Sequence, residues 1–165
     1  MVRTLLYAVL LIPTALLAFA KGPAAPLALP DGFIEFRNSD GHGTALVGSK
    51  IDRQWRNVQG IAIRFWTDDS CPVTNADISN YAPDLIEQIK KQTKHGTLGS
   101  LLHYTVAGKN WIAVTFHQAP EADRDLVVLV TQFKQSAATI QVTARQTDYA
   151  ALKTVCARII ELNRP

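Results

Sequence analysis

Cys71 is the side chain with the clearest potential for chemistry in this sequence. It lies in the stretch TDDSCPVTN (67–75), after two acids and a serine and before a proline, where a helix is expected to begin. A helix N-terminus lowers the pKa of a thiol, so a nucleophilic thiolate is one interpretation. The other is a structural disulfide with Cys156, since the chain has two cysteines.

The first twenty residues favour the disulfide. Residues 1–20 have a basic start at Arg3, an apolar run over 5–19 and a small-x-small pattern that ends at Ala20, which together predict a secretory signal peptide cleaved after Ala20. The alternative is an uncleaved membrane anchor, although Pro13 interrupts the apolar run. A periplasmic or secreted protein meets an oxidising compartment, where an even number of cysteines predicts a bond between Cys71 and Cys156.

Two histidines and an acidic pair are the other candidates for catalysis. His103 and His117 fall on neighbouring predicted strands, and Asp68 and Asp69 precede Cys71. A hydrolase built on these residues is one hypothesis. No metal site is predicted, because zinc sites usually need three or four protein ligands and no acid or cysteine is expected beside the histidines. The acids of PEADRD (120–125) are interpreted as solvated loop charges.

Motifs and charge limit the function further. The sequence has no G-x-S-x-G elbow, no H-E-x-x-H, no phosphate-binding glycine loop and no dinucleotide fingerprint, so no cofactor is predicted. The net charge is +3, or +2 once Arg3 is removed with the signal peptide. Because the bases are scattered and the charge is small, no nucleic-acid partner is expected. Contact with a membrane is expected only through an uncleaved signal peptide.

The chain is expected to fold as one domain. Three prolines and two glycines over 21–32 predict an extended leader, and residues 33–165 are long enough to bury a core. Periodicity predicts seven strands and two helices. The strands are expected at 32–36, 44–51, 59–66, 101–106, 111–117, 126–133 and 139–145, and the helices from about 74–79 to 94 and over 148–163.

The last four strands are expected to form two hairpins. A three-residue loop at 108–110 would place Leu102, Tyr104 and Val106 on one face with Ile112, Val114 and Phe116. A four-residue loop at 135–138 would group apolar residues of the second hairpin in the same way. The apolar members of that face are Val127, Leu129, Phe133, Ile140, Val142 and Ala144.

These elements predict an α+β fold: an antiparallel sheet of about seven strands, in the order β-β-β-α-β-β-β-β-α, with one disulfide. Both helices are expected on one face of the sheet, because the predicted bond ties the entrance of the first helix to the middle of the last.

The other face of the sheet would then be open and could carry the function. Its candidate ligand-binding residues are His103, Trp111, Thr115, His117, Gln141 and Arg145. We expect a non-catalytic binding or accessory protein, for example an envelope-system factor or an inhibitor, whose partner is another protein or a small ligand. The alternative is the small secreted hydrolase using His103, His117 and the Asp68/Asp69 loop. The missing motifs favour binding.

Overall fold

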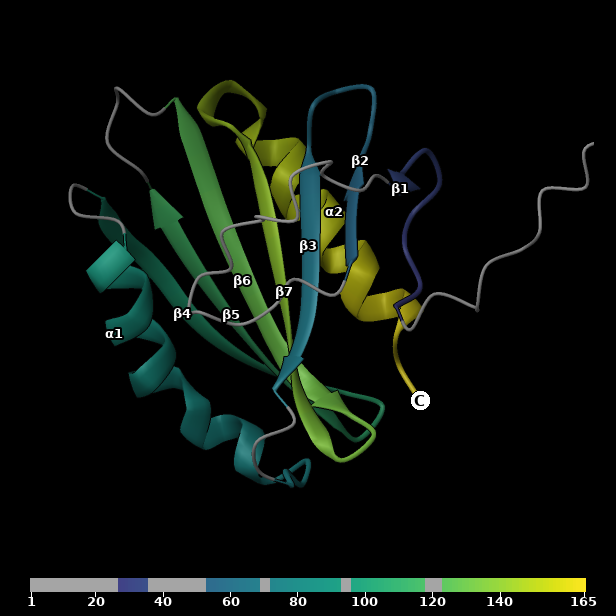
Figure 1. The fold of residues 1–165 in the computed structure, drawn as a ribbon, viewed down its shortest axis with the longest axis vertical. Coiled ribbons are helices and arrows are strands. Elements are labelled where there is room, and N and C mark those ends of the chain that lie inside the picture. Colours follow the sequence, from purple (N-terminus) through teal and green to yellow (C-terminus); the bar gives the residue numbers. More distant parts are fainter. Residues whose placement is uncertain (1–26, 36–52, 69–71, 93–95, 118–122) are drawn as a thin grey trace, which may run out of the picture.

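The computed structural model describes residues 27–35, 53–68, 72–92, 96–117 and 123–165 (Figure 1). The predicted signal peptide and the predicted strand at 44–51 lie outside these residues. The elements, in chain order, are β1 (Ile34–Glu35), β2 (Arg53–Arg56), β3 (Ala62–Asp68), the 3-10 helix η1 (Asp77–Tyr81), α1 (Ala82–Gln92), β4 (Thr97–Val106), β5 (Lys109–His117), β6 (Arg124–Phe133), β7 (Ser136–Arg145), the 3-10 turn η3 (Gln146–Asp148) and α2 (Tyr149–Leu162).

The strands form one antiparallel sheet, in the order β1-β2-β3-β7-β6-β5-β4. This confirms the antiparallel seven-stranded α+β fold expected from the sequence. Strand β2 was not predicted, because RQWR carries a single apolar residue, Trp55, which is buried.

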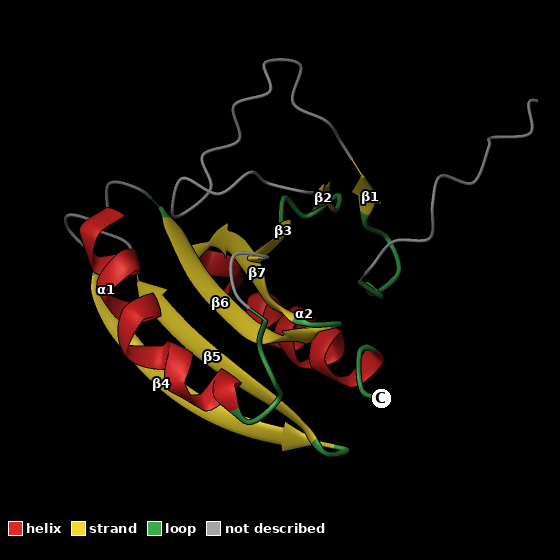
Figure 2. Cartoon of the chain, turned by 60° about the horizontal axis from the view of Figure 1, so that its bottom comes forward, coloured by secondary structure: helices red, strands yellow, loops and turns green. Residues whose placement is uncertain are grey.

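The two helices cover opposite faces of the sheet, so the prediction that both pack on one face is wrong. In one core, Leu152 and Ile159 of α2 pack with Phe65, Leu129 and Val142. A second core gathers residues of η1 and α1 with the alternate positions of the same strands: Ile78, Leu85, Ile89, Ile112, Val114, Phe116 and Val128. Figure 2 shows α1 in front of the sheet and α2 behind it.

The apolar runs of the central strands explain the two-sided packing. In β6, residues 125–131 are all buried, although successive side chains of a strand point to opposite faces. A continuous apolar run such as LVVLV is typical of a strand covered on both sides, whereas one open face would give strict alternation with polar residues.

Both predicted hairpin loops are too long. Strands β4 and β5 pair Val106 with Lys109, leaving the two-residue loop Ala107-Gly108, and both loop residues have positive φ, of 50° and 81°. Such a turn matches the twist of a tight hairpin. The observed register of β4 with β5 differs from the predicted one by an odd number of residues, which exchanges the faces of one strand. Leu102 and Tyr104 therefore share a face with Trp111 instead of Ile112. In the second hairpin Phe133 pairs with Ser136. This register differs from the predicted one by an even number of residues, so the predicted apolar face of the second hairpin is confirmed.

Part of the predicted leader belongs to the packed domain. Leu27 is buried in the core on the α2 side, and Leu29 packs against that core. The backbone of Ala28 exchanges two hydrogen bonds with the side chain of Asn163, after the end of α2.

The predicted disulfide is not seen among the described residues. Cys156 is a free, buried thiol on the sheet-facing side of α2, and Cys71 lies outside the described residues. Val73, two residues after Cys71, packs in the core on the α1 side of the sheet, opposite Cys156.

Candidate functional site

The six binding candidates predicted from the sequence lie on both faces of the sheet. Trp111, Thr115 and His117 alternate along β5 on the α2 side, where Trp111 and Thr115 are buried. His103, Gln141 and Arg145 lie on the α1 side: His103 pairs with Ile112 and Gln141 with Val128, both in the core beneath α1. The structure therefore does not bring His103 and His117 together, and these residues do not form one open surface.

His117 has a partner that the sequence analysis missed. Its Nδ1 lies 3.0 Å from Oδ1 of Asp125, and its ring is 5.3 Å from that of Tyr149. Asp125 is only 4% exposed, so its assignment to a solvated loop was wrong: it belongs to β6 and pairs with His117 across two strands. Thr115, two residues before His117 on the same face of β5, accepts a hydrogen bond at Oγ1 from the hydroxyl of Ser100 (3.1 Å).

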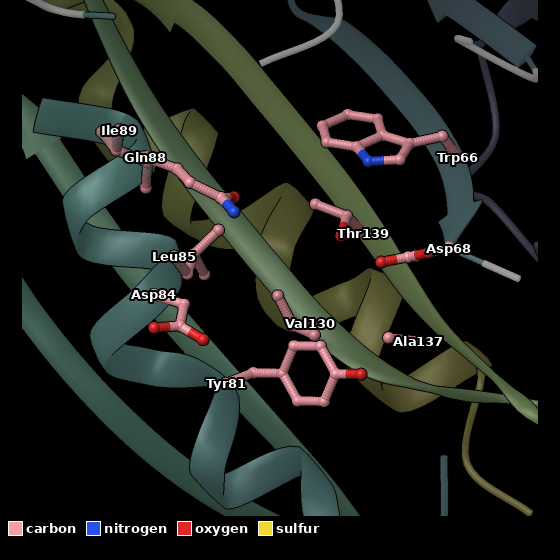
Figure 3. Close-up of a pocket in the computed structure, with 10 residues that line it drawn as sticks. All are labelled: Trp66, Asp68, Tyr81, Asp84, Leu85, Gln88, Ile89, Val130, Ala137 and Thr139. Carbon is pink, nitrogen blue, oxygen red and sulfur yellow. The ribbon is translucent and has the colours of Figure 1, made fainter. Parts of the chain in front are cut away.

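A pocket of about 200 Å³ lies on the α1 side of the sheet, between α1 and β3 (Figure 3). Two aromatic rings and two carboxylates stand around its mouth, with an amide, a hydroxyl and an apolar base. The lining residues are Trp66, Asp68, Tyr81, Asp84, Leu85, Gln88, Ile89, Val130, Ala137 and Thr139.

The sheet register assembles one wall and the floor of the pocket. Trp66 and Asp68 are two residues apart on β3 and therefore point to the same face. Trp66 pairs with Thr139 of β7, and Thr139 pairs with Val130 of β6. Ala137 is the partner of Asp68, and its small side chain leaves space between the two walls.

The helical wall follows from the spacing of its residues. The lining residues of η1 and α1 recur every three to four positions and so share one side of this helical segment. They are Tyr81, Asp84, Leu85, Gln88 and Ile89. Leu85 and Ile89 are buried against the sheet, while Asp84 is exposed at the pocket mouth. Figure 3 shows the Tyr81 ring and the Asp84 carboxylate on the helical side, facing Trp66 and Asp68 on β3.

The segment before the helix is fixed to both hairpin loops, which sets the position of Tyr81. The backbone N–H of Val73 donates to the carbonyl of Gln135 (2.7 Å). The side chain of Asn75 donates to the carbonyl of Gly108 and accepts from the N–H of Asn110. Hydrogen bonds from the hydroxyl and backbone of Thr74 lower the pKa of Asp77 at the start of η1.

The charge on this face of the sheet changes along β3. Arg64 precedes Trp66 by two residues, and burial together with Arg124 and Arg56 lowers its pKa. Among the described residues that line the pocket, in contrast, two are carboxylates and none is Lys, Arg or His. The pocket is therefore an acidic site with a cluster of arginines beyond Trp66.

The sequence contained a partial signal for this site. Asp68 is one of the acids that the sequence offers as a candidate, and periodicity predicts the helix that faces it. Trp66 and Tyr81 were not connected with them, because the predicted fold placed both helices on the same face of the sheet and did not show which strand α1 faces. A helix that covers the second face is needed to bring the two walls together.

No family model matches this chain, and no curated protein matches it. Two solved structures are similar in fold. One is the solution structure of the cyanobacterial PsbP (CyanoP) of Synechocystis, with a TM-score of 0.56, 9% identity and coverage of 82% of each chain. The other is PA94, a protein of unknown function from Pseudomonas aeruginosa, with a TM-score of 0.51, 11% identity and coverage of 84% of this chain and 83% of that one. At these identities the likeness shows a shared fold alone.

Proposed function

We propose that this chain is an exported, non-catalytic binding protein whose ligand occupies the pocket between α1 and β3. The observation that carries the proposal is the pocket itself, which combines an apolar base with a few convergent polar groups, the usual composition of a small-molecule site. We assign the chain the role of a periplasmic or secreted accessory protein. Its partner is a small ligand bound in this pocket, rather than a molecule bound on an open face of the sheet.

The composition of the pocket favours binding over catalysis. A pair of catalytic carboxylates needs two different environments, so that one acid holds its proton while the other remains ionised. Asp68 and Asp84 are both exposed, so burial does not distinguish them. The hydrolase alternative has less support, because His103 and His117 lie on opposite faces of the sheet.

Blocking the pocket tests the proposal. Thr139 lines the pocket and is half-buried, and Thr143 lies on the same face of β7 but outside the pocket. We expect a thermal-shift screen of small metabolites to yield ligands that stabilise the wild type and the Thr143→Tyr control but not Thr139→Tyr. Hits that bind Thr139→Tyr with unchanged affinity would place the ligand elsewhere and contradict the proposal.

Export is tested separately by the mass of the protein recovered from its host. The proposal rests on the signal-peptide pattern of residues 1–20, and Leu27 enters the core seven residues after Ala20. The protein from the periplasm or the medium should begin at Lys21. An intact Met1 in a membrane fraction would contradict cleavage. None of the described helices is long and apolar enough to span a membrane.

A further inference from the structure

We infer that the pocket between α1 and β3 binds a small organic cation, an amine or a guanidine. Its charged group would lie between Asp68 and Asp84, with its apolar part against Trp66 and Tyr81. This inference rests on the proposed binding function and adds the chemical class of the ligand.

The first argument is the charge of the walls. One carboxylate comes from β3 and one from the first turn of α1, on opposite sides of the pocket. A ligand held between them has an acceptor on each side, and Lys, Arg and His are absent from the described lining residues. Arg64, on the same face two residues before Trp66, repels a cation from the far end and directs it toward the acids.

The aromatic rings give the second argument. Trp66 and Tyr81 stand on opposite walls, with Trp66 only 4% exposed. The face of an indole or phenol ring attracts an ammonium or guanidinium group within about 6 Å of its centre, more strongly where water is excluded. Carboxylates in an aromatic-walled pocket therefore select a cation that also carries apolar surface, rather than a hydrated metal ion.

Agmatine, which carries an amine at one end and a guanidinium group at the other, is a suitable probe. Titration calorimetry with the chain from Lys21 should detect binding, and Asp68→Asn and Asp84→Asn should each weaken Kd roughly two- to fivefold, because each variant removes one charge pair at an exposed carboxylate. The matched control is Glu87→Gln, which removes an exposed carboxylate of α1 that pairs with Lys91 outside the pocket. Butanol and butyrate serve as neutral and anionic probes.

The possible results distinguish the inference that the ligand is a cation from the proposal that the pocket binds a ligand at all. Binding of agmatine that is lost in Thr139→Tyr, weakened in both Asp variants and unchanged in Glu87→Gln supports the inference. Failure of wild type to bind agmatine at millimolar concentration, or equal affinity in the Asp variants, overturns it. If the metabolite screen still finds neutral or anionic ligands that Thr139→Tyr excludes, the proposed binding function stands without the cation.

Discussion

At the scale of single residues, Cys156 is a thiol held inside the core. It is 7% exposed among the residues that join α2 to the sheet, and burial raises its pKa to about 12 from 9.0. A protonated thiol is a poor nucleophile, since the thiolate is the reactive form. Val73 packs on the opposite face of the sheet from Cys156.

We therefore expect Cys156 to be unreactive in the folded protein and free in the unfolded one. Ellman's reagent at pH 8 should not modify Cys156 in the native state. Unfolding the exported protein in guanidinium chloride without a reductant should expose two thiols per chain, the number of cysteines in the sequence. If no thiol appears, the Cys71–Cys156 disulfide predicted from the sequence is correct and the free thiol is wrong.

The raised pKa also predicts how stability depends on pH. Below pH 9.0 the thiol is protonated in both states, so it contributes no pH dependence. Above it the unfolded state loses the proton while the folded state keeps it up to about pH 12. The free energy of unfolding should then fall by about 1.4 kcal/mol per pH unit relative to Cys156→Ala. Urea unfolding of both proteins at pH 7, 8, 9.5 and 10.5 measures this difference. Parallel curves across the series would contradict it.

Asp125 shows why single polar residues were hard to place from the sequence. Its neighbours in PEADRD are charged, so composition predicts a loop. In the structure it begins the buried part of β6, and a contact with His117 compensates its burial. That compensation depends on the pairing of β5 with β6, which no local pattern contains.

At the scale of elements, the two edges of the sheet differ sharply. One edge is β1, two residues long. The other is β4, ten residues long, and its sequence TLGSLLHYTV has no Asp, Glu, Lys or Arg. Leu98, Leu101, Leu102 and Tyr104 are each 36–45% exposed. Because an edge strand offers unpaired backbone groups, long apolar edges without charges promote association between chains.

A charge on β4 should suppress that association. Leu102→Lys places an ammonium group at the middle of the edge, where it opposes pairing with another strand, and an exposed substitution changes the free energy of unfolding by less than about 0.5 kcal/mol. Light scattering at increasing concentration should show association in wild type and less in Leu102→Lys. Ile34→Lys, at the exposed opposite edge, is the control and should associate like wild type. Equal association of all three proteins would show that β4 is not the contact.

The elements themselves were easier to predict than their pairing. Local patterns located six of the seven described strands and both helices, since apolar alternation and helical stripes are local signals. The register of β4 with β5 was missed because both faces of β5 are apolar. A register shift of one residue therefore still leaves apolar side chains on both faces, and the sequence pattern does not exclude it. The turn at Ala107-Gly108 was the only other signal, and alanine at a φ of 50° is an unusual choice there.

At the scale of the whole molecule, the sheet separates two cores, and the site depends on both. The core on the α1 side holds the helical wall of the pocket against β5 and β6. The core on the α2 side fixes the opposite faces of β3 and β7, the strands that supply Trp66 and Thr139. Neither the second core nor the pocket was predicted, because the predicted fold has both helices on one face of the sheet.

The two ends of the described chain meet on the α2 side. Asn163 donates from Nδ2 to the carbonyls of Ala28 (2.7 Å) and Ile159 (2.8 Å), and its Oδ1 accepts from the N–H of Ala28 (2.9 Å). Leu27, beside this contact, is 4% exposed. The described segment that begins at Leu27 is thus held to the domain by the side chain of Asn163 and by the apolar side chains of Leu27 and Leu29.

This contact between the two ends of the described chain predicts that Leu27 and Asn163 are energetically coupled. In the chain from Lys21, Leu27→Ala should lower the free energy of unfolding by about 2–4 kcal/mol and Asn163→Ala by about 1–3 kcal/mol. The double variant should lose less than the sum, since either change alone releases the segment and with it the contacts of the other residue. Urea unfolding of the four proteins measures the coupling. Glu161→Ala, which removes an exposed ion pair with Arg158 on the same helix, should cost less than about 0.5 kcal/mol. Additive losses would mean that the two contacts act independently and that the N-terminal segment does not close as a unit.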